Sequence, residues 1–183
     1  MTILVLRFDI KWRLLYLTIG TVVFVIAYSI GAATDISKSE AENLRQQFNE
    51  QIEGIDQNGI FMNNLKISLG MFIPALGIVL GTFSGFSTGL IFNVISESSP
   101  LLNNISPLVI LITPFGVMEV FAYGLAMSRS GMLIYQIVKK RQWREYVIPT
   151  IIEIGIVISI LLIGAIIEWH MIVQFDEVTN TPV

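Results

Sequence analysis

Residues 77–89 read GIVLGTFSGFSTG and carry glycine at every fourth position, at Gly77, Gly81, Gly85 and Gly89. Four residues is close to one turn of an α-helix, so these glycines fall along one helix face. In an apolar segment, a face of small residues lets a neighbouring helix approach closely. The same glycines also permit a bend in the chain. The two interpretations give different numbers of membrane crossings.

The composition is that of an integral membrane protein. Hydrophobic residues make up 54% of the 183 residues and charged residues only 14%, against about a quarter in an ordinary soluble domain. Residues 14–33 carry no charge and are long enough to cross a hydrocarbon core of about 30 Å. Because this apolar run is longer than the core of a signal peptide, we expect a retained span. The lipid bilayer is therefore the first expected partner.

Several classes of function have no support in the sequence. The chain contains no cysteine and a single histidine, His170, so we predict no thiolate or histidine metal cluster and no cofactor. A net charge of -3 does not favour nucleic-acid binding. The sequence has no nucleophile elbow, zinc-protease, P-loop or dinucleotide fingerprint, and we predict that the protein is not an enzyme.

The positive charges predict the orientation. Eight of the eleven lysine and arginine residues fall in residues 1–13 and 129–144, and the positive-inside rule places both segments in the cytoplasm. The acidic segment 34–59 and the acidic tail then lie outside. We predict a multi-pass protein of the cell membrane, with a cytoplasmic N-terminus and an extracytoplasmic C-terminus.

The acidic segment 34–59 predicts an extracytoplasmic amphipathic helix. Ser37 and Glu40 have the spacing of a capping box at a helix start. Apolar residues then recur at helical spacing, namely Leu44, Phe48, Ile52 and Ile55. Gly54 and Gly59 are expected to end this helix.

The remaining apolar segments leave two topologies open for a single membrane domain, 1–183. In the first, 65–95 bends near 82–85 into two spans, 65–82 and 85–95. In the second, 65–95 is one long helix and 105–127 is re-entrant. Both break 105–127 at 113–116, where Pro114 removes a backbone donor. Both place a basic cytoplasmic loop at 128–146 and a last span at 147–167. Re-entrant segments need protein or water around their backbone, so we favour an all-α polytopic transmembrane helix bundle of about five hydrophobic helices.

The candidate site residues are the polar groups within or beside these spans. Glu119 and Glu153 lie inside apolar segments, where a carboxyl group either bonds a neighbouring helix or serves an ion or proton path. Pro114 and Gly116 mark a helix break beside Glu119, and broken helices bind ions in transporters. Glu168 borders the last span. Ala122 and Ala126 form a second small-residue face, for helix packing within the chain or with partners.

Three motifs resemble the stage II sporulation protein M family of integral membrane proteins. They are Phe-Met-Asn-Asn at 61–64, Pro-Phe-Gly-Val-Met-Glu at 114–119 and Ile-Ile-Glu at 166–168. The second is similar to the family motif Pro-His-Gly-x-x-Glu, with Phe115 in the histidine position. The resemblance implies a multi-span membrane component without established catalytic activity that works in a membrane complex.

These observations lead to three functional hypotheses. The first is a non-catalytic integral membrane subunit or scaffold that packs against other integral membrane proteins, including an accessory subunit of a membrane enzyme. The second is a small transporter or channel-like protein that uses the Pro114 break and Glu119. The third, from the resemblance alone, is an envelope or division factor. The sequence does not give the oligomeric state.

Overall fold

Every element in the described part of the chain is a helix. The computed structural model describes residues 10–98 and 105–180, with residues 175–180 described by backbone alone. Along the chain these are α1 (Ile10–Ala32), α2 (Lys38–Ile52), α3 (Gln57–Gly70), α4 (Leu76–Ser98), the 3₁₀ helix η2 (Pro107–Ile112), α5 (Pro114–Val138) and α6 (Trp143–Asn180). The all-α prediction is confirmed.

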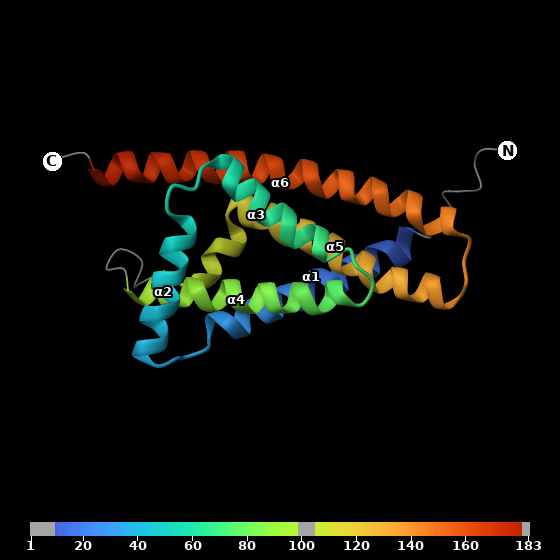
Figure 1. The fold of residues 1–183 in the computed structure, drawn as a ribbon, viewed down its shortest axis with the longest axis horizontal. Coiled ribbons are helices and arrows are strands. Elements are labelled where there is room, and N and C mark those ends of the chain that lie inside the picture. The colour runs from blue at the N-terminus through green and yellow to red at the C-terminus, as the bar shows by residue number, and fades with distance from the viewer. Residues whose placement is uncertain (1–9, 99–104, 181–183) are drawn as a thin grey trace.

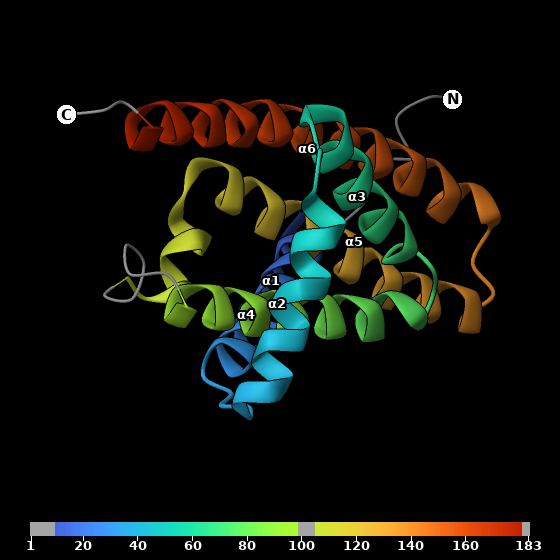
Figure 2. The same cartoon turned by 60° about the vertical axis from the view of Figure 1, so that its left-hand side comes forward.

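Helices α1, α3, α4, α5 and α6 run broadly along the long axis of the molecule, and α2 lies across one end (Figure 1). Helices α1, α4 and α6 run in one direction, and α3 and α5 return in the other. We call the end where α1 and α6 begin the basic end, because exposed Lys11 and Lys140 lie there. We call the opposite end, where α2 lies, the acidic end. Figure 2 shows the same crossing of α2 over the bundle from another side.

Three of these helices are long and apolar enough to cross a membrane within the described residues. They are α1, α4 and the part of α6 from Trp143 to Gln174. Helix α3 has 14 residues and is about 21 Å long at 1.5 Å per residue, which is shorter than the hydrocarbon core. The chain is therefore a membrane protein with three candidate spans, and a count of five crossings stays a prediction.

The predicted bend at residues 82–85 is wrong, because α4 is continuous from Leu76 to Ser98. The chain turns instead at residues 71–75, between α3 and α4. Pro74 lies in this turn, and a proline disfavours the helical conformation of the residue before it. Ala75 has a positive φ of 66°, and the Gly77 amide bonds the Ile73 carbonyl at 2.9 Å. A single helix over residues 65–95 is excluded by the same turn.

The predictions for residues 105–167 can be compared with helices η2, α5 and α6. Helices η2 and α5 lead from the acidic end to the basic end without turning back (Figure 1), so the chain does not reverse at Pro114 as the re-entrant alternative required. The predicted break at 113–116 lies where η2 gives way to α5. The predicted loop at 128–146 is mostly helix, since α5 continues to Val138 and α6 begins at Trp143. The predicted last span at 147–167 is the middle of α6.

Helix α2 is the predicted amphipathic helix, and its capping box is present. The Glu40 amide bonds the Ser37 hydroxyl oxygen, while the Glu40 carboxylate accepts from the Ser37 amide at 3.0 Å and its hydroxyl at 2.6 Å. These bonds, the side-chain one first, lower the pKa of Glu40. Gly54, at a φ of 68°, follows the end of α2, whereas Gly59 lies inside α3. No residue of α2 is buried.

The glycine face of α4 is packed inside the molecule. Gly77, Gly81, Gly85 and Gly89 are all buried. A Cβ atom at Gly81 would lie 2.3 Å from Sδ of Met127 on α5, and one at Gly89 would lie 2.0 Å from the carbonyl oxygen of Tyr28 on α1. Both distances are far below van der Waals contact. The Met127 side chain is flexible, whereas the Tyr28 carbonyl is fixed in the backbone, so at Gly89 only glycine allows α4 this close to α1.

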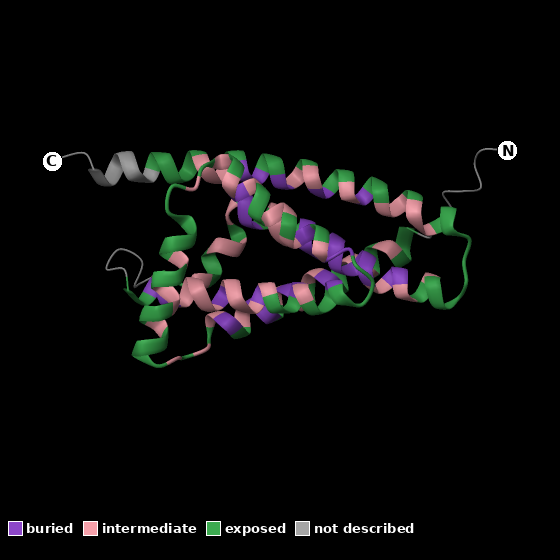
Figure 3. Cartoon of the chain, viewed as in Figure 1, coloured by how far each residue is buried: buried purple, intermediate pink, exposed green. Residues whose placement is uncertain are grey.

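The core lies between the inner faces of the long helices, as Figure 3 shows. Ala122 and Ala126 of α5 are fully buried there, beside Met127 and the α6 residues Val157 and Leu161. The outer faces of α1, α4 and α6 expose large aliphatic side chains. In a membrane protein these outer faces contact lipid, because the bilayer is as apolar as they are.

Candidate functional site

A buried ion-pair network joins α1, α5 and α6 in the half of the bundle nearer the basic end. Arg13 donates to the two carboxylate oxygens of Glu153, from Nε to Oε1 at 2.6 Å and from Nη2 to Oε2 at 2.7 Å. Arg129 donates to the same carboxylate through its Nε, at 2.8 Å from Oε2, and through Nη2 to Oε1. Each carboxylate oxygen therefore accepts from both arginines.

The neighbours of this network satisfy the rest of the Arg13 guanidinium. Its Nη1 donates to the Ser128 hydroxyl at 2.7 Å, and its Nη2 lies 3.3 Å from the Leu125 carbonyl oxygen. Arg129 is 1% exposed and Glu153 9% exposed. Charges this deep are tolerated in a membrane protein only when they are paired. The network therefore fixes the relative positions of three helices.

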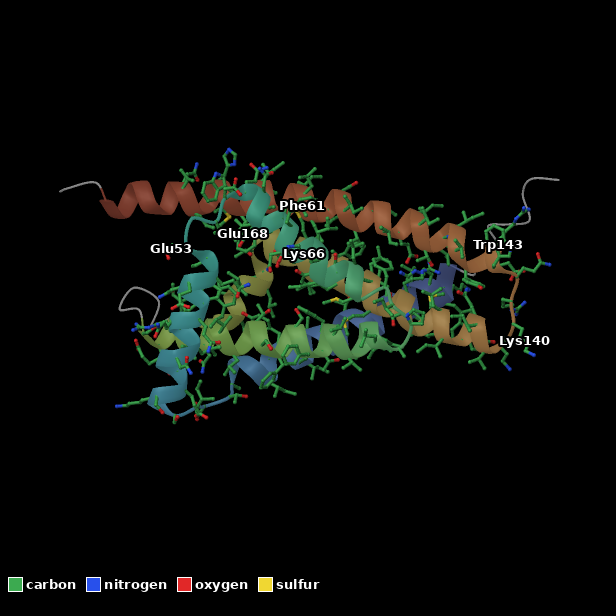
Figure 4. All side chains as sticks on the ribbon, viewed as in Figure 1. Glu53, Phe61, Lys66, Lys140, Trp143 and Glu168 are labelled. Carbon is green, nitrogen blue, oxygen red and sulfur yellow. The ribbon has the colours of Figure 1, made fainter. Side chains whose placement is uncertain are left out.

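A second polar cluster lies toward the acidic end and brings together α3, α5 and α6. Glu119 of α5 accepts a hydrogen bond of 2.5 Å from the side-chain amide of Asn64 on α3. Glu168 of α6 lies near Glu119 and Tyr123, and negative charges on Glu168 and Glu119 would repel each other. Oε2 of Glu168 is buried, and no atom in the described part of the chain bonds it. Figure 4 labels Glu168 where α6 passes α3.

The helix break at Pro114 positions Glu119. Thr113 caps α5, accepting from the Gly116 amide at 3.1 Å and donating to the Ile110 carbonyl at 2.7 Å. A Cβ at Gly116 would lie 1.9 Å from that carbonyl oxygen, so η2 and α5 meet in a turn that only glycine fits. Glu119 follows on the second turn of α5, facing Asn64.

The structure thus separates the candidate residues into two groups. Pro114, Gly116, Glu119 and Glu168 belong to the cluster at the acidic end, whereas Glu153 belongs to the ion-pair network. Glu119 and Arg129 are ten residues apart on α5, which is about 15 Å along a helix axis. The glycines of α4 and the alanines of α5 are packing residues inside the same bundle.

Sequence reasoning missed the partners of Glu153. The charge pattern places Arg13 in the basic segment 1–13 and Arg129 in the basic segment 129–144, where both indicate orientation only. The available signal was Glu153 itself, because a carboxylate within an apolar span needs a cationic partner. Asn64 belongs to the motif at 61–64, but the sequence does not predict its contact with Glu119.

The described residues offer no ready metal centre. Among the side chains that the structure describes, in residues 10–98 and 105–174, no three or more of histidine, cysteine, aspartate or glutamate gather closely enough to hold a metal ion. His170 contacts the Ile166 carbonyl of its own helix at 2.9 Å. What the two polar groups can do is bind helices to one another and, at Glu119 and Glu168, exchange a proton or accept a small cation.

Comparison with known proteins decides the family. The family model for stage II sporulation protein M matches residues 14–169. The chain belongs to the stage II sporulation protein M family. The matched region contains Asn64, Glu119 and Glu168 of the cluster at the acidic end, and Arg129 and Glu153 of the ion-pair network. Arg13 lies just before it. Searches among curated proteins and among solved structures found no significant match.

Proposed function

We propose that this protein is a non-catalytic integral membrane subunit or scaffold of a larger membrane protein complex, including the accessory subunit of a membrane enzyme. The observation that carries the proposal is the pairing of Glu153 with two arginines. Its carboxylate is fully occupied by Arg13 and Arg129 and holds α1, α5 and α6 in one arrangement. Such a group supports a rigid structural role better than a reactive one.

Two exposed elements offer contacts for protein partners. Helix α2 lies across the acidic end with none of its residues buried. Helix α6 has 38 residues and is about 57 Å long, nearly twice the hydrocarbon thickness of the bilayer. Turns of α6 therefore extend outside the membrane. Helix α2 supports a subunit role because its exposed surface is polar, and the length of α6 supports it because part of that helix must project beyond the lipid.

The test is the composition of the native assembly. The tagged full chain is extracted from its own membrane in mild detergent, isolated, and its companions are identified and quantified. Companions at a fixed molar ratio, retained in the Glu119→Gln variant, are the expected result. A lone chain or a pure homo-oligomer that keeps its helical circular dichroism would contradict the subunit role.

A small transporter or channel-like protein is the second candidate, and the cluster at the acidic end favours it. Glu119, Asn64 and Glu168 come from three helices beside a helix break, an arrangement that transporters use to bind ions. This proposal predicts proton or cation flux into liposomes that contain the chain alone. Flux should be lost in Glu119→Gln and kept in Glu145→Gln, an exposed carboxyl on α6.

We also propose five membrane crossings, α1, α3, α4, α5 and α6, with the basic end in the cytoplasm. The distribution of lysine and arginine supports this orientation. The chain has no cysteine, so single-cysteine variants report on topology without background. A membrane-impermeant thiol reagent applied to intact cells should label Glu50→Cys on α2 and spare Lys140→Cys. The reverse pattern would invert the orientation.

A further inference from the structure

The basic end carries a group of exposed positive side chains drawn from two parts of the chain. Lys11 lies in the first turn of α1, and the others lie at the turn between α5 and α6. We call this group the basic collar, and it consists of Lys11, Lys139, Lys140, Arg141 and Arg144. All five side chains are exposed, and Glu145 is the exposed acidic side chain next to them in the sequence.

Exposed tryptophans lie beside the collar. Trp12 and Trp143 are each 58% exposed, and the Arg144 guanidinium lies 5.3 Å from the centroid of the Trp143 ring. Tryptophan is enriched where the hydrocarbon core meets the headgroups. The two side chains therefore place the collar at the level of the lipid headgroups, and Figure 4 shows Lys140 and Trp143 together at this end.

Lys140 occupies a backbone position that normally selects glycine. Its φ is 51°, and the amides of Lys140 and Arg141 bond the carbonyls of Ile137 and Gln136. This is the Schellman arrangement at a helix C-terminus, where glycine is the usual residue because a Cβ is strained there. A lysine at this place keeps a positive charge at the tip of the turn despite the strain.

We propose that the basic collar is a binding surface for the headgroups of anionic phospholipids. The collar is positively charged, as a binding surface for anionic headgroups must be, and it lies at the depth of the headgroups. It also retains a lysine at position 140, where the backbone conformation favours glycine. Each basic side chain near an anionic surface contributes about a fivefold increase in association. The inference is independent of the proposed subunit role, because it concerns the lipid around the chain.

The test measures which lipids surround the collar. The full chain with Trp169→Phe, which leaves Trp12 and Trp143 as the tryptophans, is reconstituted in phosphatidylcholine vesicles. Brominated phosphatidylglycerol or brominated phosphatidylcholine is added at equal mole fraction, and quenching of tryptophan fluorescence is recorded. Phosphatidylglycerol should quench more strongly, and added salt should reduce the difference.

Two collar variants and one control separate charge from folding. Lys140→Gly removes one charge and relieves the strained φ, so its thermal midpoint should hold or rise while the preference for phosphatidylglycerol falls severalfold. Adding Lys139→Gln and Arg141→Gln should abolish the preference. Lys38→Gln, an exposed lysine on α2 at the acidic end, should leave it unchanged.

Three results would overturn the proposal. Equal quenching by the two brominated lipids would show that the collar does not select anionic headgroups, and would favour an acidic protein as its occupant. Retention of the preference in the triple variant would assign it to other residues. A loss in Lys38→Gln equal to that in Lys140→Gly would make it a property of total charge.

Discussion

Replacing Glu153 with glutamine tests the ion-pair network most directly. Each carboxylate oxygen of Glu153 accepts from both Arg13 and Arg129. Whichever oxygen becomes an amide nitrogen, two of these four hydrogen bonds turn into contacts between donors. Two buried guanidinium groups also lose their counter-charge. Removing one partner from a buried ion pair costs about 3–5 kcal/mol, and we expect a loss of this size in the free energy of unfolding.

The measurement is unfolding of the full chain in mixed micelles, followed by circular dichroism as the fraction of denaturing detergent rises. Glu145→Gln is the matched control, because it makes the same change in the first turn of the same helix at an exposed position. An exposed substitution of this kind should change stability by no more than about 0.5 kcal/mol. Its transition should therefore overlay that of the parent.

A compensating variant distinguishes charge from packing. Replacing the whole network by apolar residues, Arg13→Met, Arg129→Met and Glu153→Leu, removes every buried charge at once, and such exchanges are often neutral. The Ser128 hydroxyl keeps its bond to the Leu125 carbonyl at 2.8 Å. We expect this variant to recover most of the loss. A cost below about 1 kcal/mol for Glu153→Gln, or a triple variant as unstable as the single one, would refute the reasoning.

Further predictions concern the backbone. Gly89→Ala should destabilise the fold by about 1–3 kcal/mol, because its Cβ would lie 2.0 Å from the α1 backbone. Gly155→Ala should stabilise the fold by about 0.5–1 kcal/mol, because a Cβ there has nothing within 4 Å. The same detergent titration measures both. Ala75→Gly should raise the thermal midpoint, because Ala75 has a φ of 66°. Ser37→Ala should speed amide hydrogen exchange in the first turn of α2. The pKa of Glu40 is lowered in the folded protein, so ionised Glu40 stabilises the first turn of α2 fully above the ordinary carboxyl pKa. This stabilisation is lost as the pH falls through the lowered pKa. Amide exchange of the parent in this turn, corrected for the intrinsic pH dependence of exchange, should therefore become faster on acidification.

The helices and the close-packed faces could be predicted from local patterns. Uncharged length predicted α1, and four-residue glycine spacing indicated the packed face of α4. The capping box at Ser37 needs only residues three apart, and the proline break at Pro114 needs only one residue. Each of these signals acts within one or two turns of helix, so it can be recognised from the sequence alone.

The wrong boundaries and the missed partners depend on contacts between distant segments. The turn at residues 71–75 is the exception, because Pro74 disfavours the helical conformation of the residue before it and is therefore a local signal. The end of α5 was predicted too early because a basic residue such as Arg129 is typical of a cytoplasmic loop. Its pairing with Glu153 explains why it lies inside a helix instead. That pairing joins residues 24 positions apart, and no periodic pattern reports it.

The network also ties the first described helix to the last, with consequences for how the chain is inserted. Arg13 and Glu153 are 140 positions apart, so at the usual rate of translation Glu153 is synthesised roughly 7–28 s after Arg13. During that interval Arg13, close to the start of α1, keeps its guanidinium in the headgroup region by extending its side chain toward water. Only the arrival of α6 draws it inward. The bundle therefore cannot close before Glu153 has been synthesised, and until then Arg13 and Arg129 lack the carboxylate that they share.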